Sequence, residues 1–386
     1  MSKNEKNTLW SAQPHTLAKI SILRAYLSRW FEILGRSKPK QELWYIDGFA
    51  GPGEYTNAPS GSPIAAISSA RDALASVKAS WVAGDIHCVF IEQDEKRFQH
   101  LRNKIDMIKV DPRIKIHFLN RSFVDGLAEL KAQRANPFAS SSPLFAFIDP
   151  FGAKGVPFSE VKELLSRGAC EVLINFDSDG VGRIYRAKEA ANYKAILNDV
   201  FGDDSWELEF EKHQDTHELY RGVLSLYKQK LRALPNVRYV FAFEMRSPKD
   251  TIDYHLVFAS QHPLGLEKMK EAMKTIAKDG DFCFSDAHIK QTSLFRFDEP
   301  EMHSAQLHEQ FRGQTVDYET LNDYALNESP FTNPKSMLRD LEKKEKIQTF
   351  SNDPKRRKFT FNEEKLIAIE FLTGDSHDKE NKNRMD

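Results

Sequence analysis

Short apolar runs alternate with amphipathic segments through the first half of the chain. The runs "LWYID", "HCVFIEQD", "RIKIHFLN", "LFAFIDPFG" and "CEVLINFD" are rich in branched and aromatic residues, which favours strands. Helical patterns lie between them at 62–75, 95–105, 124–133 and 158–166. Strands this apolar are covered on both faces, so the pattern predicts an α/β fold of the Rossmann-like kind with a mostly parallel sheet.

Two further patterns extend this core. The segment His15–Leu34 has apolar residues at helical spacing, and helices are also predicted near 187–200, 216–233 and 265–278. Two alternating runs, 236–247 and 252–260, flank the polar turn "PKDT" and predict an antiparallel hairpin. The predicted sheet is therefore mostly parallel with one antiparallel hairpin.

The pattern changes again near residue 299. A helix at 334–345 is followed by the short runs "IQTF" and "KFTF" around the turn "SNDPKRR", the outline of a winged helix-turn-helix. We therefore expect an N-terminal helical segment at 1–40, a Rossmann-like domain at 41–298 and a winged-helix domain at 299–372. The polar tail at 373–386 is expected to be disordered.

Composition narrows the class of protein. The 386 residues are 40% hydrophobic and carry a net charge of −1, as in a soluble globular protein without general attraction for polyanions. Three scattered cysteines and an unpatterned set of histidines predict no metal site. The polar N-terminus and the lack of a long apolar run predict a cytoplasmic protein that binds no membrane.

The first predicted strand ends in a carboxylate, Asp47, and a turn that contains Gly48, Gly51 and Gly53 follows at once. Glycines let the backbone approach a ligand, and in doubly wound folds ligands lie at the carboxyl ends of strands. An acid inside the turn would repel a pyrophosphate but attract a sulfonium or amino group, which favours S-adenosylmethionine over a dinucleotide. Glu92, at the end of the second strand, is placed to bind the ribose hydroxyls. A tight turn without a ligand is the alternative.

A second acid, Asp149, ends the fourth strand and precedes Pro150, Phe151 and Gly152. In amino-methyltransferases, an acid or amide at this place accepts hydrogen bonds from the NH₂ group that is methylated, and an aromatic ring stacks on the base. Such acceptors would align the nitrogen lone pair with the methyl group, so catalysis would be mainly positioning. The alternative is that Asp149-Pro150 merely ends a strand.

The stretches "YIDGFAGPGEY", "GSPIAA", "FIDPFG" and "YHLVFASQHPLGLEKM" together resemble the three-Cys-motif partner (TcmP) family over roughly residues 10–300. The family is similar to class I methyltransferases, and its name refers to a neighbouring partner protein that carries a cysteine motif. The resemblance implies S-adenosylmethionine as cofactor and Asp149, Pro150 and Phe151 as the catalytic segment. The implied cofactor-binding residues, with Ser122 standing where such enzymes commonly place an acid near the adenine, are Asp47, Gly48, Phe49, Gly51, Gly53, Glu92, Gln93 and Ser122.

The sequence therefore predicts an S-adenosylmethionine-dependent methyltransferase that acts on a nucleic acid, with a base amine as the favoured acceptor. Between 335 and 358, nine basic residues stand against four acidic ones, which predicts phosphate contacts. The predicted contact residues are Lys335, Arg339, Lys343, Lys344, Lys355, Arg356, Arg357 and Lys358. A small-molecule methyltransferase and a non-catalytic adaptor for the partner protein are the alternatives. DNA and RNA are not distinguished.

Overall fold

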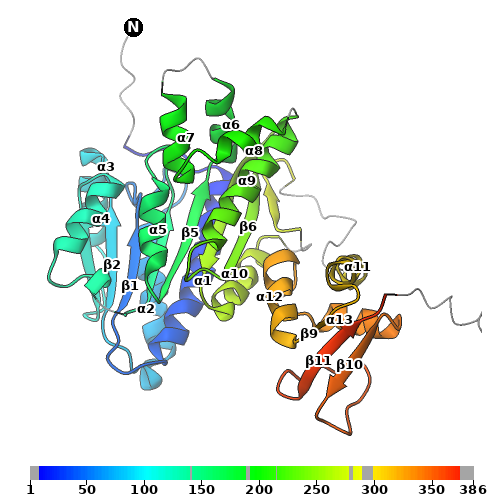
Figure 1. Cartoon of the computed structure of the whole chain (residues 1–386). Helices are drawn as coiled ribbons and strands as arrows, with labels where there is room; N and C mark the ends of the chain where they lie inside the picture. Colours follow the sequence, from blue (N-terminus) through cyan, green and yellow to red (C-terminus); the bar gives the residue numbers. More distant parts are fainter. Residues whose placement is uncertain are drawn as a thin grey trace, which may run out of the picture. The chain divides into compact units, whose positions relative to one another are not determined.

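The computed structural model describes residues 8–139, 141–187, 192–213, 215–277, 281–288 and 299–373. The chain divides into two compact units (Figure 1). Unit 1 comprises Met1–Ala277 and Phe282–Gln291, and unit 2 comprises Lys278–Asp281 and Thr292–Asp386. Apart from Thr373, the tail that the sequence predicts to be disordered lies outside the described residues.

Unit 1 is built on an eight-stranded sheet with the spatial order β3-β2-β1-β4-β5-β7-β6-β8. The strands β1 to β5 are parallel, and β7 is antiparallel to both of its neighbours, β5 and β6. This confirms the mostly parallel sheet with an antiparallel hairpin. The strand bounds are β1 Leu43–Asp47, β2 Ile86–Ile91, β3 Ile114–Leu119, β4 Leu144–Ile148, β5 Cys170–Phe176, β6 Tyr239–Arg246, β7 Ile252–Ser260 and β8 Cys283–Ser285.

Helices cover both faces of this sheet, as the continuous apolar strands require (Figure 1). One face lies against α1, α2 and α10, and the other packs mainly against α4, α5, α7 and α9. Strand residues alternate between these layers, so Trp44 and Ile46 face the second group of helices. The bounds are α1 Pro14–Gly35, α2 Ser62–Ser76, α3 Glu95–Asp106, α4 Phe123–Ala132, α5 Phe158–Ser166, α6 Ser178–Arg186, α7 Tyr193–Phe201, α8 Trp206–Glu211, α9 Thr216–Arg232 and α10 Pro263–Lys274, with short 3₁₀ helices at Lys78–Ser80 and Pro137–Ala139.

Strand order reverses within this sheet. From β1 the chain builds outward through β2 and β3, and then returns to place β4 on the other side of β1. The loops that leave β1 and β4 therefore diverge to opposite sides. In open α/β sheets, such a reversal opens a crevice at the carboxyl ends of the two strands.

The described residues of unit 2 form three helices and a three-stranded antiparallel sheet with the order β10-β11-β9. The bounds are α11 Pro300–Phe311, β9 Thr315–Val316, α12 Tyr318–Glu328, α13 Lys335–Lys343, β10 Ile347–Ser351 and β11 Leu366–Phe371. The predicted strand "KFTF" is wrong, because 358–361 forms turns and Phe361 is buried in the core of this unit. The partner of β10 is the more apolar run Leu366–Phe371.

Candidate functional site

A cavity of about 250 Å³ lies where the sheet order reverses, at the carboxyl ends of β1, β4 and β5. Its walls come from the loop after β1, the loop after β4, the start of α6 and the first turns of α1. Phe49, Gly51, Gly53, Asp149, Pro150 and Phe151, which are candidates from the sequence, all line it. The structure thus brings together the two acid-ended strands that the sequence singled out.

The glycine turn after β1 closes against the end of β2. Gly51 and Gly53 have positive φ angles of 62° and 82°, a region that other residues rarely adopt. A Cβ atom on Gly53 would also lie 2.7 Å from Leu101 Cδ1. The backbone path therefore requires glycine at 53 and favours it at 51.

Glu92 anchors this turn through hydrogen bonds from backbone amides. Its Oε2 accepts from the Gly51 amide at 2.9 Å, and its Oε1 accepts from the Asp94 amide at 2.7 Å. Glu92 is buried and does not line the cavity, and burial raises the pKa of its carboxyl group. In this structure Glu92 anchors the glycine turn, and its carboxylate oxygens already have backbone donors.

Asp47 is fully buried at the end of β1, on the face of the sheet that carries α2. Tyr45 donates to its Oδ2 at 3.2 Å, and the Phe49 amide donates to its Oδ1 at 3.4 Å. Burial raises the pKa of Asp47 to about 7, although a hydrogen bond with Ser62 opposes the shift and nearby Asp149 adds to it. Ser62 lines the cavity and Asp47 does not, so Ser62 separates Asp47 from the cavity.

Three other predicted cofactor-binding residues also stand outside the cavity lining. Gly48 precedes the turn, Gln93 is exposed beyond β2, and Ser122 caps the N-terminus of α4. The Ser122 hydroxyl accepts from the Asp125 amide at 3.2 Å and donates to the Asp125 carboxylate at 2.6 Å. Phe49 connects the turn to α4, since its ring stacks on Phe123 at 5.5 Å.

Asp149 is held in the cavity by two side chains from different elements. Lys19 of α1 donates to it, with Nζ 2.7 Å from Oδ1 and 2.6 Å from Oδ2. Asn175 of β5 donates to Oδ1 at 2.6 Å. The Lys19 side chain is only 7% exposed and that of Asp149 is 21% exposed. The ion pair is therefore largely shielded from water, and Asp149 is the more accessible partner.

An aromatic rim borders the same cavity. The Phe151 ring is 67% exposed and meets Trp10 edge to face at 5.8 Å, and Trp10 meets Tyr55 at 5.7 Å. The Arg97 guanidinium lies 4.9 Å from the Trp10 ring centre and 5.0 Å from that of Phe151. An exposed ring backed by a cation is suited to stacking on a planar ligand.

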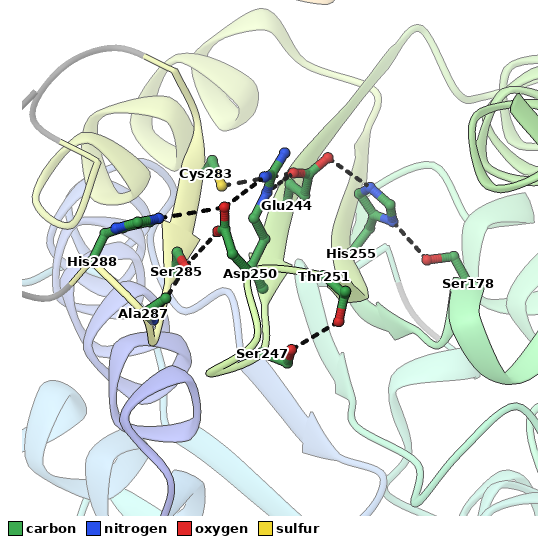
Figure 2. Close-up of polar contacts among 11 residues, drawn as sticks. Ser178, Glu244, Ser247, Asp250, Thr251, His255, Cys283, Ser285, Ala287 and His288 are labelled. Atoms are coloured by element: carbon green, nitrogen blue, oxygen red, sulfur yellow. Dashed lines mark hydrogen bonds and ion pairs between the residues drawn. The ribbon is translucent and has the colours of Figure 1, made fainter. Parts of the chain in front are cut away.

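Asp177, the N-cap residue of α6, also lines the cavity. His255 of β7 contacts the first residue of α6. The Nδ1 atom of His255 lies 3.0 Å from Ser178 Oγ, and its Nε2 atom lies 3.7 Å from the Glu244 carboxylate (Figure 2). Burial would raise the pKa of Glu244, but hydrogen bonds from His255 and Arg246 outweigh it and lower that pKa to about 2. His255 is thus a hydrogen-bonded core residue.

Sequence reasoning missed the partners of Asp149. Lys19 lies on the buried face of a helix, beside Leu23 and Tyr26, and a lysine among apolar helix positions was the available signal. Asn175 is the corresponding polar interruption in the apolar strand β5. Among the described residues, no cluster of His, Cys, Asp or Glu is placed to hold a metal ion.

The basic residues predicted to contact phosphate all lie in unit 2, and intramolecular contacts engage several of them. Arg356 pairs with Glu342 at 2.8 Å, and Lys344 pairs with Asp340 at 2.7 Å. Arg339 donates to the Phe359 carbonyl, and Lys335 lies over the Tyr318 ring. The remaining residues are exposed and make no ion pair with any part of the chain that the structure describes: Lys343, Lys355, Arg357 and Lys358.

Comparison with known proteins gives structural likeness only. No protein-family model and no curated protein matches the sequence. An O-methyltransferase from Bacillus cereus, solved with SAH, is 14% identical, with a TM-score of 0.33, over 61% of this chain and 80% of that one. The O-methyltransferase TomG from Streptomyces achromogenes, solved with SAM, is 15% identical, with a TM-score of 0.31, over 61% and 79%. At such low similarity, the chemistry of this chain has to be argued from its own site.

In the described part of the chain, no helix has the length and apolar character needed to cross a membrane.

Proposed function

We propose that the protein is an S-adenosylmethionine-dependent methyltransferase whose acceptor is an amine. The observation that carries the proposal is the cavity itself: a glycine turn with two left-handed residues and the segment Asp149-Pro150-Phe151 line one space at the strand-order reversal. Loops at this place in α/β sheets commonly bind nucleotide-like ligands. The protein would resemble the TcmP family in both motif and chemistry.

The roles follow from the contacts. The glycine turn, held by Glu92, would let the cofactor lie close to the backbone. Lys19 and Asn175 fix Asp149, whose open side would accept a hydrogen bond from the acceptor amine. Because Lys19 neutralises this carboxylate, Asp149 would orient an uncharged amine rather than trap an ammonium ion. The exposed ring of Phe151 would stack on the acceptor.

A nucleic acid base is the acceptor that we favour, and unit 2 supports it. The order α11-β9-α12-α13-β10-β11, with a basic segment between β10 and β11, is consistent with a winged helix. Replacing Lys355, Arg357 and Lys358 together by Gln should weaken nucleic-acid binding and flatten its salt dependence. The control replaces three exposed lysines of unit 1, Lys38, Lys96 and Lys249, by Gln. Equal loss in both triple variants would remove the specific role of this segment.

One observation favours a small amine as the alternative acceptor. Four carboxylates (Asp149, Asp177, Asp253 and Glu54) line the cavity against only Lys19 and Arg183 as full cations. An acidic cavity repels phosphates and attracts amines. A small-molecule methyltransferase would keep full activity in the triple variant of unit 2.

Transfer of a tritiated methyl group tests the proposal. The full chain is incubated with the labelled donor and with separate DNA, RNA, protein and small-molecule fractions of a cell extract. Label in DNA or RNA supports a nucleic-acid base as the acceptor, and label in the small-molecule fraction supports a small amine. Absence of label from every fraction would leave a non-catalytic adaptor for a partner protein.

A further inference from the structure

A second and larger cavity lies at the opposite edge of the same sheet, at the amino ends of β4 and β5. Its volume is about 620 Å³, and its walls come from the C-terminal half of α1, the start of α10 and the segments that enter β4 and β5. It shares no lining residue with the cavity at the carboxyl ends. Cavities of this size are typical of sites for small molecules.

One wall of this cavity is apolar. Trp30, Ile33 and Leu34 line it from α1, and Leu144 and Leu264 line it from β4 and α10. Such a wall is suited to the hydrocarbon body of a ligand, because burial of apolar surface supplies binding free energy.

A carboxylate, Glu171 of β5, also lines the cavity. Its Oε2 accepts from Tyr26 Oη at 2.6 Å and from Trp30 Nε1 at 2.8 Å, and its Oε1 accepts from Ser260 Oγ at 2.8 Å. All three donors are uncharged. Burial raises the pKa of Glu171 above its ordinary value, although these three hydrogen bonds oppose the shift. The described residues provide Glu171 with no ion pair, so a bound cation would stabilise its ionised form.

Three basic residues line the cavity, Lys38, His262 and Lys268, and none of them forms an ion pair with Glu171 in the part of the chain that the structure describes. Lys268 lines the cavity but pairs with Glu267 at 2.9 Å and with Glu271 at 2.8 Å. His262 accepts from the Leu264 amide through Nδ1 at 3.2 Å. Glu171 therefore has no internal cation at ion-pair distance among the described residues, and a bound cation would supply one.

We propose that this cavity binds a small organic cation, in which an ammonium group pairs with Glu171 and an aromatic or aliphatic body lies against Trp30, Ile33 and Leu34. Two independent features favour this ligand class: a carboxylate without an ion pair attracts a cation, and the apolar wall favours a cation with a hydrocarbon body. The inference does not depend on methyl transfer, since it concerns the other edge of the sheet.

The test uses three matched probes on the full chain: 2-phenylethylammonium, 2-phenylethanol and 3-phenylpropionate. Binding is measured by calorimetry and by ligand-observed magnetic resonance. We expect the ammonium probe to bind about tenfold or more tightly than the alcohol, and the carboxylate probe to bind most weakly. Equal affinities, a preference for the carboxylate, or no binding of any probe at millimolar concentration would overturn the proposal.

Two variants locate the site. Glu171→Gln should reduce the affinity for the ammonium probe to that for the alcohol, whereas Glu32→Gln, on α1 and paired with Arg29 outside the cavity, should change nothing. Leu34→Trp should fill the apolar wall and abolish binding of both probes. If Glu171→Gln does not fold, Leu34→Trp decides alone, and undiminished binding of the ammonium probe in that variant contradicts the proposal.

Discussion

Two carboxylates at opposite edges of one sheet are reached by the same helix. Lys19 of α1 bonds to Asp149 after β4, whereas Tyr26 and Trp30 of α1 bond to Glu171 at the start of β5. Tyr26 and Trp30 follow Lys19 by seven and eleven positions, so the three side chains share one face of α1. Eleven helical residues rise about 16 Å, close to the length of a five-residue strand.

The difference between the two carboxylates lies in their neutralisation. Asp149 has an internal cation, so a ligand there meets an oriented hydrogen-bond acceptor with little net charge. Glu171 has only neutral donors and no ion pair among the described residues, so a cation bound there would stabilise its ionised form. One edge of the sheet is thus arranged for positioning an uncharged amine, and the other for holding a cation.

Removal of the first carboxylate should have the largest effect. Asp149→Ala should lower methyl transfer by about 100-fold or more, because the acceptor loses the group that orients it, while cofactor affinity stays within about twofold. Single-turnover transfer and calorimetry with S-adenosylhomocysteine measure the two quantities. Asp72→Ala, which removes an exposed carboxylate of α2, is the control. Full activity of Asp149→Ala would refute the assigned role.

The glycine turn belongs only to the carboxyl edge, and Gly53→Ala tests its importance. The substitution combines a φ angle of 82° with a Cβ contact of 2.7 Å, so we expect cofactor affinity to fall by about tenfold or more. Gly155→Ala is a matched control, because its φ angle is 92° but no atom lies within 4 Å of the added Cβ. Equal affinities in the two variants would show that the turn does not approach the cofactor.

Lys19→Met would make Asp149 resemble Glu171, a carboxylate without a cation. Because the Lys19 side chain is 7% exposed, we expect the free energy of unfolding to fall by about 2 kcal/mol. The exposed pair Lys194–Glu207 provides the control, since Lys194→Met should leave the free energy of unfolding nearly unchanged. Urea unfolding followed by tryptophan fluorescence is suitable, because all five tryptophans lie in unit 1. Equal losses would mean that the buried pair contributes no more than a surface pair.

A third carboxylate, Asp47, gives a smaller effect that depends on pH. Burial raises its pKa to about 7 in the folded chain, whereas the pKa of an Asp side chain in an unfolded chain is about 3.9. Between these values the folded chain holds a proton that the unfolded chain has released, so stability falls as pH rises and levels off above about pH 7.

The corresponding variant is Asp47→Asn, which should remove this contribution. Between about pH 5.5 and 6.5, the wild type should lose about 1 kcal/mol of unfolding free energy relative to Asp47→Asn. Tryptophan-detected urea unfolding at both pH values gives the comparison. Parallel pH profiles for the two proteins would contradict a raised pKa at Asp47.

The strands of unit 1 were predictable because each is a continuous apolar run bounded by turn residues, as in "LWYID" and "CEVLINFD". The meeting of Gly51 and Asp149 in one cavity was also predictable, since parallel strands end at the same edge. In unit 2 the alternation of polar and apolar residues in "KFTF" is typical of a strand, but this segment forms no strand. Its Phe361 lies in a loop and is buried in the core of the unit.

Contacts set by helix packing could not be predicted. Lys19 lies 130 residues from Asp149 in the sequence, and their pairing depends on how α1 crosses the sheet. The roles of Glu92 and Ser122 likewise depend on local backbone donors, which a sequence does not display. Residue type and strand position predicted the location of the site, and the three-dimensional packing determines which of those residues face the cavity.

The most direct test of the central claim is calorimetric titration of the full chain with S-adenosylhomocysteine and, separately, with ATP. If the glycine turn and Asp149 line a methyl-donor site, S-adenosylhomocysteine will bind to the wild type and to Gly155→Ala, bind weakly to Gly53→Ala, and ATP will give no heat. Heat with ATP but none with S-adenosylhomocysteine would contradict the account.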